Sequence, residues 1–136
     1  DKENIHKSSY LDILDDDLKP YFKAAVGNYR VTEDAKKEFS KLKLDINKIS
    51  NLMNTHHNYL KNELKITTPE IDKMIDVSKK NGAIGSKIVG SGGGGSIVSL
   101  STNSNTSNKI VSELKRIGVK DVFIAKKGKG PTINYE

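Results

Sequence analysis

The residues of this sequence that could do chemistry are gathered in one glycine-rich stretch, formed by Gly90, Ser91, Gly92, Gly93, Gly94, Gly95 and Ser96. An ordered glycine costs roughly 1 kcal/mol of backbone entropy relative to alanine. A folded protein therefore keeps successive glycines where the backbone needs positive φ angles or where a ligand approaches the main chain closely. Because successive exposed N–H groups can hold an anion, the stretch predicts a loop that binds phosphate.

The same residues also have the composition of a flexible linker, so the stretch by itself leaves two interpretations open. It is not a Walker loop, because no Gly-Lys-Ser or Gly-Lys-Thr follows it, and no GxGxxG segment opens a helix after it. The flanking segments, residues 87–89 and 97–100, both have the apolar character of strands. We therefore expect the loop to connect two strands inside a folded unit, and protease cleavage within it would instead indicate an engineered fusion through a linker.

Helical patterns fill the chain ahead of the loop. The first 27 residues predict one or two short helices that end near Gly27. The acidic run 15–17 precedes or begins a helix, and its side chains diverge too much to bind a metal ion together. A second helix is expected to begin at Thr32 as its N-cap. Its inner face would comprise Ala35, Phe39 and Leu42.

Two further helices have clearer ends. One begins at Asp45, and its apolar stripe consists of Ile49, Leu52, Met53, His56 and Leu60. The next has Thr68 as its N-cap and Pro69 at its first position, and Gly82 ends it. Its inner side is expected to comprise Ile71, Met74, Ile75 and Ser78.

The second half of the chain changes to strands. Residues 84–89 and 97–100 predict the two strands around the loop, and a helix then runs from Ser107 as cap to Gly118. Residues 121–125 and 131–135 predict two more strands, the last at a sheet edge because of its proline. This order predicts an α+β fold, with an antiparallel sheet, helices packed on one face and extra N-terminal helices.

Composition fits a single domain over residues 1–136. No apolar run is long enough to span a membrane, and the absence of cysteine excludes disulfides, thiolate catalysis and Cys-ligated zinc. We expect a cytoplasmic protein. The net charge of +6 is dispersed, apart from a cluster formed by Lys126, Lys127 and Lys129. That cluster keeps a small nucleic-acid-binding module open as an alternative, although nucleic acid is the less expected partner.

Three segments, in order, resemble motifs of one family, the galactokinase, homoserine kinase, mevalonate kinase and phosphomevalonate kinase (GHMP) family. Residues 81–96, which include the glycine-rich stretch, closely resemble its third motif. Residues 66–72 (Ile-Thr-Thr-Pro-Glu-Ile-Asp) resemble its V-S-x-P-E-[LI]-D segment. Residues 52–60 resemble its Leu-Met-x-x-x-His-x-x-Leu segment through Leu52, Met53, His57 and Leu60. The chain is thus identified as a member of this family, and the resemblance favours an ordered loop over a linker.

The resemblance implies the ferredoxin-like C-terminal domain of a kinase that transfers phosphate from ATP, with Mg²⁺, to a hydroxyl of a small metabolite. The cofactor-binding residues would be Gly90, Ser91, Gly92, Gly93, Gly94, Gly95 and Ser96. In the family, the main phosphate loop, the catalytic aspartate and the sugar contacts belong to an N-terminal domain. Motifs of that domain are absent from this sequence, so no catalytic or metal-binding residue is assigned, and the chain alone is expected to be inactive. Its partners would be that domain, ATP and a sugar.

Within the family, residues 28–33 and 123–126 resemble galactokinases, which implies galactose as the acceptor. Lys87 and Gly93 instead resemble mevalonate kinase or heptose-phosphate kinases, so these acceptors remain as alternatives. We expect His57 to pack or hydrogen-bond within the helices rather than to act as a base. Glu70 and Asp72 are expected to be first-turn helix charges rather than an acid–base pair.

Overall fold

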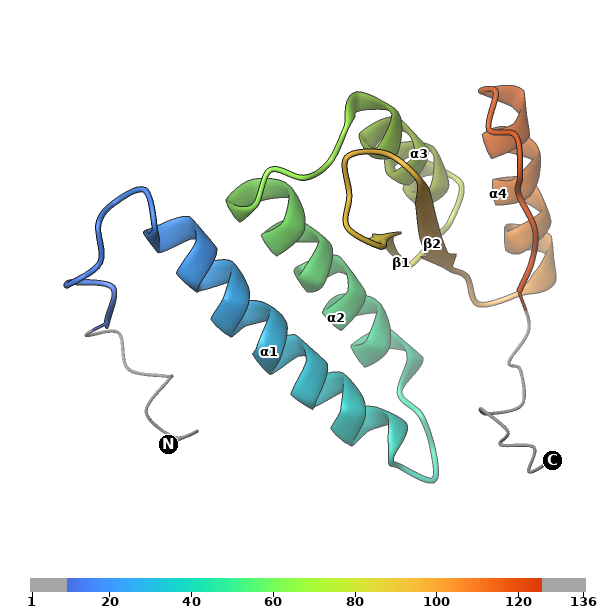
Figure 1. Cartoon of the computed structure of the whole chain (residues 1–136). Coiled ribbons are helices and arrows are strands. Elements are labelled where there is room, and N and C mark those ends of the chain that lie inside the picture. The colour runs from blue at the N-terminus through green and yellow to red at the C-terminus, as the bar shows by residue number, and fades with distance from the viewer. Residues whose placement is uncertain (1–9, 126–136) are drawn as a thin grey trace, which may run out of the picture.

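The computed structural model describes residues 10–125 (Figure 1). The elements are α1 (Lys19–Phe39), α2 (Ile46–Asn58), the π-helical turn η3 (Tyr59–Glu63), α3 (Pro69–Lys80), β1 (Gly85–Val89), β2 (Ser96–Leu100) and α4 (Ser104–Arg116). The two strands form an antiparallel sheet in the order β1-β2. None of the helices in residues 10–125 is long and apolar enough to cross a membrane.

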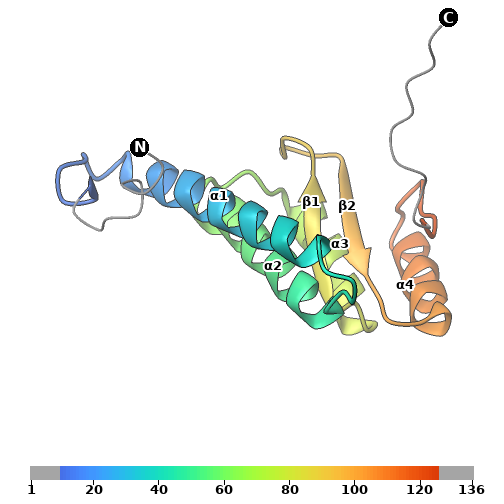
Figure 2. The same cartoon turned by 90° about the horizontal axis from the view of Figure 1, so that it is seen from below.

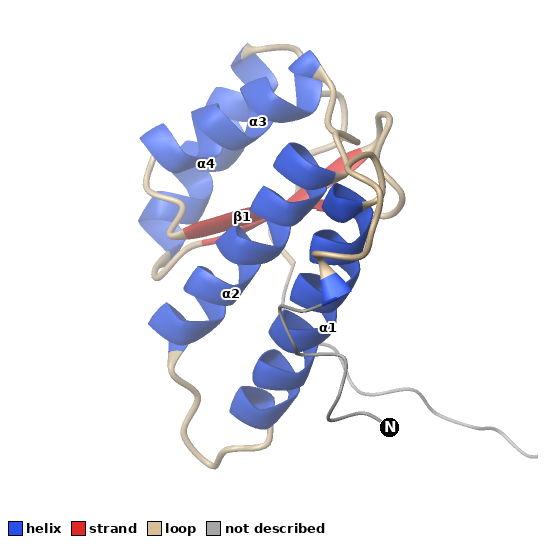
Figure 3. Ribbon diagram, turned by 90° about the vertical axis from the view of Figure 1, so that its left-hand side faces the viewer, coloured by secondary structure: helices blue, strands red, loops and turns tan. Residues whose placement is uncertain are grey.

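The hairpin lies between two groups of helices. Helices α1 and α2 run antiparallel beside each other, and α2 contacts β1 (Figures 1 and 2). Helix α3 contacts both strands, and α4 packs against α3 (Figure 2). Seen from the side of α1 and α2, strand β1 passes behind α2 (Figure 3). This arrangement of helices around an antiparallel hairpin confirms the predicted α+β class.

Several predicted helix ends are confirmed by hydrogen bonds. The Asp45 side chain accepts from the amides of Asn47 and Lys48 at the start of α2. The Thr68 hydroxyl accepts from the amide of Ile71 at the start of α3, where Pro69 occupies the first helical position. Gly82 and Gly118 follow α3 and α4 with φ of 101° and 96°, which is the left-handed conformation that glycine adopts without strain.

Helix α1 corrects the prediction of separate helices that end near Gly27 and begin at Thr32. It runs unbroken from Lys19 to Phe39, and the Thr32 hydroxyl donates to the carbonyl of Asn28 inside it. Gly27 lies under the ring of Tyr59: a Cβ built on Gly27 would lie 2.3 Å from Cζ of that ring. The glycine therefore makes room for a neighbouring side chain and does not end the helix.

Two predictions for the second half of the chain are wrong, and two others concern residues outside the described range. The N-cap of α4 is Asn103, one turn before the predicted Ser107, and its side chain accepts from the Thr106 amide. Residues 121–125 form no strand; they run back beside α4, and Val122 packs on the core (Figure 1). The predicted edge strand 131–135 and the lysine cluster at 126–129 lie outside the described residues.

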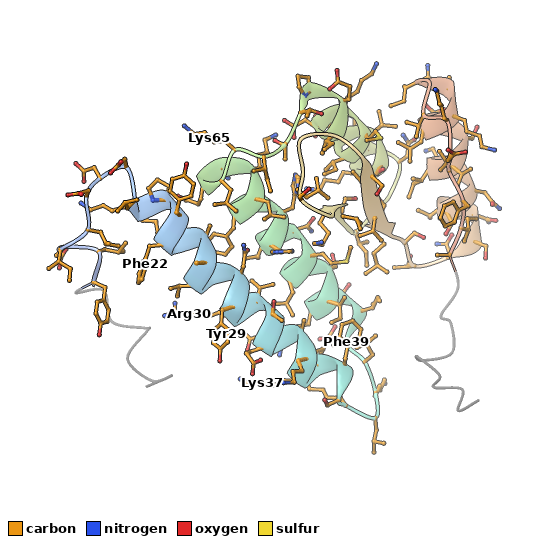
Figure 4. The ribbon with its side chains drawn as sticks, viewed as in Figure 1. Phe22, Tyr29, Arg30, Lys37, Phe39 and Lys65 are labelled. Atoms are coloured by element: carbon orange, nitrogen blue, oxygen red, sulfur yellow. The ribbon has the colours of Figure 1, made fainter. Side chains whose placement is uncertain are left out.

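The predicted inner face of the second helix is wrong for two of its three residues. Phe39 and Leu42 are exposed and Ala35 is half-buried, whereas the buried residues of α1 are Ala24, Gly27 and Glu38. Figure 4 shows Tyr29 on the side of α1 that faces away from α2.

Two apolar clusters hold α3 between the hairpin and α4. The first joins Leu60, Ile71, Ile75 and Ile88, with Leu64, Ile66, Met74 and Ile97 packed against it. The second joins Ala83, Ile110 and Leu114, with Met74, Val77, Ile117, Val119 and Val122 packed against it. Ile88, the last but one residue of β1, connects the loop end of that strand directly to α3.

A buried carboxylate joins the end of α1 to the start of α2. Glu38 is fully buried and accepts hydrogen bonds from the Lys41 ammonium and the amide of Asp45, and Lys48 lies 3.3 Å from its carboxylate. These three groups lower the pKa of Glu38 to about 2. The carboxylate therefore stays ionised in the folded protein and fixes the antiparallel pairing of the two helices.

Hydrogen bonds from α2 satisfy the edge of β1 that does not face β2. The Asn54 amide donates to the carbonyl of Ile84 at 3.0 Å and accepts from the amide of Ser86 at 3.2 Å. The Ser50 hydroxyl also donates to the Ile84 carbonyl. One side chain thus replaces the two backbone partners that a neighbouring strand would supply, and it aligns the hairpin with α2.

We expect Gly27→Ala to destabilise the protein by about 1–3 kcal/mol, because the added methyl group overlaps the Tyr59 ring. An exposed glycine in a helix would show the opposite sign, since alanine stabilises a helix by about 1 kcal/mol. Urea unfolding measures the difference. In a Tyr59→Leu background the same substitution should be neutral or stabilising; a stabilising effect in the wild-type background would contradict the packing role of Gly27.

Asn54→Ala should cost about 1–3 kcal/mol of unfolding free energy, because it removes both partners at the edge of β1. Asn51→Ala is the matched control, as Asn51 is exposed on the same helix, and it should change stability by less than about 0.5 kcal/mol. Equal effects of the two substitutions in thermal unfolding would show that Asn54 does not hold the strand.

Candidate functional site

The glycine-rich stretch forms the tip of the hairpin. The strand register pairs Val89 with Ser96 and Ile88 with Ile97, so residues 90–95 form a six-residue connection between the paired ends. The loop is therefore fixed at both ends by a regular ladder, as predicted for a loop inside a folded unit.

The backbone of this loop can be formed only by residues that adopt positive φ without strain. Gly90, Gly92, Gly93, Gly94 and Gly95 have φ of 87°, 79°, 72°, 140° and 96°. A residue with a Cβ reaches this region at a cost of order 1–3 kcal/mol each. Five such positions in one loop explain why the sequence has glycine there, and they confirm one of the two expected reasons for the run.

Two of the glycines contact Ile66, in the connection between η3 and α3. The amide of Gly93 donates to the Ile66 carbonyl at 2.8 Å. A Cβ built on Gly92 would lie 2.4 Å from the same oxygen. Gly92 and Gly93 thus hold the loop in place.

The remaining loop residues face open space. A Cβ built on Gly90, Gly94 or Gly95 would meet nothing within 4 Å. Among the described residues, the Gly93 amide is the one loop amide that donates a hydrogen bond. The amides of Gly94 and Gly95 therefore donate no hydrogen bond within the described residues, and an added Cβ at either position would face open space.

The electrostatic surroundings of the loop are positive on the side of α2. Lys87 lies on β1, three residues before the loop, and its ammonium donates to the Ile88 carbonyl at 2.7 Å. Partial burial lowers the pKa of Lys87. Burial first, and then the charge of Lys87, lower the pKa of His56, so this imidazole is neutral at pH 7. Lys87, rather than His56, is therefore the charged member of this pair.

Contacts within and between the helices account for the other polar residues that the sequence analysis singled out. His57 is 3% exposed, and burial, followed by the charge of Lys79, lowers its pKa. Asp72 forms an ion pair with Lys61 at 3.0 Å, which joins α3 to η3. The backbone of Glu70 itself and the Thr68 side chain lower the pKa of Glu70, as expected for a carboxylate in the first turn of a helix.

Residues 10–125 contain no group of three or more His, Asp or Glu side chains placed to hold a metal ion. The described part of the chain therefore offers backbone amides and no metal-ligand set. Two residues that position the loop were not found from the sequence. Asn54 was an unassigned position of the Leu-Met-x-x-x-His segment, and Ile66 was assigned only as part of a motif. A small polar residue one turn after Ser50 was the available signal for Asn54.

Comparison with known proteins shows the family of this chain. A family model described as GHMP kinases C terminal matches residues 35–120. A galactokinase of Actinobacillus succinogenes is 34% identical over 87 residues, covering 58% of this chain and 22% of that protein. A galactokinase of Mannheimia succiniciproducens is 32% identical over 87 residues, with the same coverage. A mevalonate kinase of Methanocaldococcus jannaschii is 35% identical over 69 residues, covering 51% of this chain and 21% of that protein.

The chain thus spans about a fifth of the length of the curated relatives it matches. The family match covers more than half of the chain, from within α1 to the end of α4, and it includes all three motif segments and the whole loop. The chain belongs to the family of GHMP kinase C-terminal domains.

Proposed function

We propose that this chain is the C-terminal domain of an ATP-dependent sugar kinase of the galactokinase type, which acts in the cytoplasm. Its loop at residues 90–96 would support the nucleotide phosphates, and a hydroxyl of galactose would receive the phosphoryl group. Two galactokinases among the similar proteins support the choice of acceptor.

The observation that supports nucleotide binding most directly is the open face of the loop. The free amides of Gly94 and Gly95 and the space around them fit phosphate oxygens, which need donors and close approach to the main chain. Phosphoryl transfer depends mainly on positioning and on stabilising charge. Preorganised amides of this kind supply that stabilisation without having to reorganise during the reaction.

The chain would need a second domain for catalysis. A kinase requires a group that orients the attacking hydroxyl and, in most cases, Mg²⁺ bound near the phosphates. The described residues contain no set of ligands for that ion, so we assign Mg²⁺ to the N-terminal domain of the whole enzyme. The fragment alone would bind nucleotide weakly and transfer no phosphate.

A mevalonate kinase is the alternative within the family. The relative from Methanocaldococcus jannaschii is as similar to this chain as the galactokinases are, and Gly93 stands where galactokinases usually have phenylalanine. A heptose kinase is a further alternative, because Lys87 and Gly93 also resemble that subfamily. In each case the loop would bind the same triphosphate, and the acceptor would be selected in the other domain.

One titration tests the proposal. We expect Mg·ATP to shift the ¹⁵N–¹H resonances of Gly94 and Gly95 in the chain, because their amides would meet the phosphates. Adenosine, which lacks phosphates, is the control and should leave these resonances unchanged. With galactose added, the same sample should release no ADP.

Two results would contradict the proposal in different ways. Shifts confined to surface lysines, with the loop amides unchanged, would show that the loop does not bind nucleotide. Galactose-dependent ADP release by the chain alone would show that it contains catalytic residues that we assign to the other domain.

A further inference from the structure

We infer that Ile66 is the positioning residue of the glycine loop, and that it acts through its backbone. This inference rests on the proposed role of the loop in binding phosphates. It assigns the connection between η3 and α3, residues 64–68, the task of setting where the loop amides lie.

The contact between Ile66 and the loop is formed by main-chain atoms. The carbonyl of Ile66 accepts from Gly93 at 2.8 Å, and it leaves no space for a Cβ on Gly92. Because the next two amides, of Gly94 and Gly95, make no hydrogen bond within the described residues, the bond at Gly93 is the last fixed point before the ligand-facing part of the loop. Any shift of Ile66 would therefore move those amides.

Ile66 is itself fixed on two sides. Its amide donates to the carbonyl of Leu60 at 3.2 Å. Its side chain packs against the apolar cluster that includes Leu60, Ile71 and Ile88. Since Ile88 lies near the loop end of β1, the side chain of Ile66 packs on the core that holds this strand, while its carbonyl holds the loop.

Two unusual backbone features precede Ile66 directly. The chain leaves α2 through the π-helical turn Tyr59–Glu63, in which the Leu64 amide donates to the carbonyl of Tyr59 at 3.1 Å. Lys65 then has φ of 52°, and it is the one non-glycine residue with positive φ in residues 10–125. Both features are unfavourable and are retained where the surroundings fix them, frequently at functional sites. The Lys65 side chain points away from the hairpin, so its backbone serves to turn the chain (Figure 4).

These contacts give the three sequence motifs one structural role. Residues 52–60 end in the π-helical turn, residues 66–72 begin with Ile66 and cap α3, and residues 81–96 end in the loop. The first two segments converge on the point where the third is held. Their order and spacing are therefore explained by positioning of the loop, without any side-chain chemistry of their own.

Hydrogen exchange at the Gly93 amide tests the inference without a ligand. Gly92→Ala places a methyl group against the Ile66 carbonyl and should speed exchange of the Gly93 amide by at least about tenfold. Gly90→Ala is the matched control, because Gly90 has a similar φ, 87° against 79°, but no neighbour within 4 Å of its added Cβ. It should leave that exchange rate nearly unchanged.

Inorganic tripolyphosphate then tests whether the contact matters for binding. In the folded proteins at 25 °C, Gly92→Ala should weaken tripolyphosphate binding, followed at the Gly94 and Gly95 amides, by about tenfold or more relative to Gly118→Ala. Gly118 lies outside the loop, has a φ of 96° and has no neighbour within 4 Å of its added Cβ, so this variant controls for backbone strain. Equal affinities of the two variants would show that Ile66 has a structural role only. If the wild type binds no tripolyphosphate, the proposed function fails. The exchange experiment still shows whether the hydrogen bond between Gly93 and Ile66 holds the loop.

A measurement on the unaltered chain covers the case in which Gly92→Ala does not fold. A scalar coupling through the hydrogen bond, between the Gly93 nitrogen and the Ile66 carbonyl carbon, should be detectable in the wild type. Its absence, together with rapid exchange of the Gly93 amide, would overturn the inference.

Discussion

Close approach of two backbone segments is the constraint on which this domain's site depends. The carbonyl of Ile66 meets residues 92–93 at a distance that only glycine permits at position 92. Several other features of the fold position these two segments. Ile88 and its apolar cluster hold the hairpin against α3, and Asn54 aligns β1 with α2. The π-helical turn after α2 leads the chain to Ile66, which lies beside the loop.

The loop therefore has two parts: one part fixes it to the connection before α3, and the other is the part that we propose to bind phosphate. Gly92 and Gly93 are used to fix the loop, whereas Gly94 and Gly95 keep their amides free. A binding site for phosphate needs donors that are already oriented, because reorganisation would cost part of the binding energy. The stabilising contact at Gly93 and the amides of Gly94 and Gly95, which we propose to bind phosphate, are adjacent in the chain, so the contact also restrains these amides.

The features that could be predicted from the sequence are those set by local chemistry. Asp45, Thr68 and Pro69 begin their helices because their own side chains or ring satisfy the requirements of a first turn. The two strands and the loop between them followed from β-branched residues around glycines. The family followed from three motifs, and the family match over residues 35–120 confirms it. The assignment of individual loop residues to phosphate stays a prediction.

The features that could not be predicted arise from contacts between distant residues. In the sequence, Gly27 suggests the end of a helix, but in the structure it packs against Tyr59, more than 30 positions away. The residues around Gly27 in the sequence do not indicate that contact. Phe39 was placed in a core that α1 builds instead from Ala24 and Gly27 and the buried carboxylate of Glu38. Asn54 has an ordinary helical sequence context, and its role appears only when β1 lies beside it. A crystal structure of this chain is the most direct test of the account: it should show residues 90–96 in one ordered conformation with the Gly93 nitrogen bonded to the Ile66 carbonyl, whereas a loop without density, or one turned away from Ile66, would contradict it.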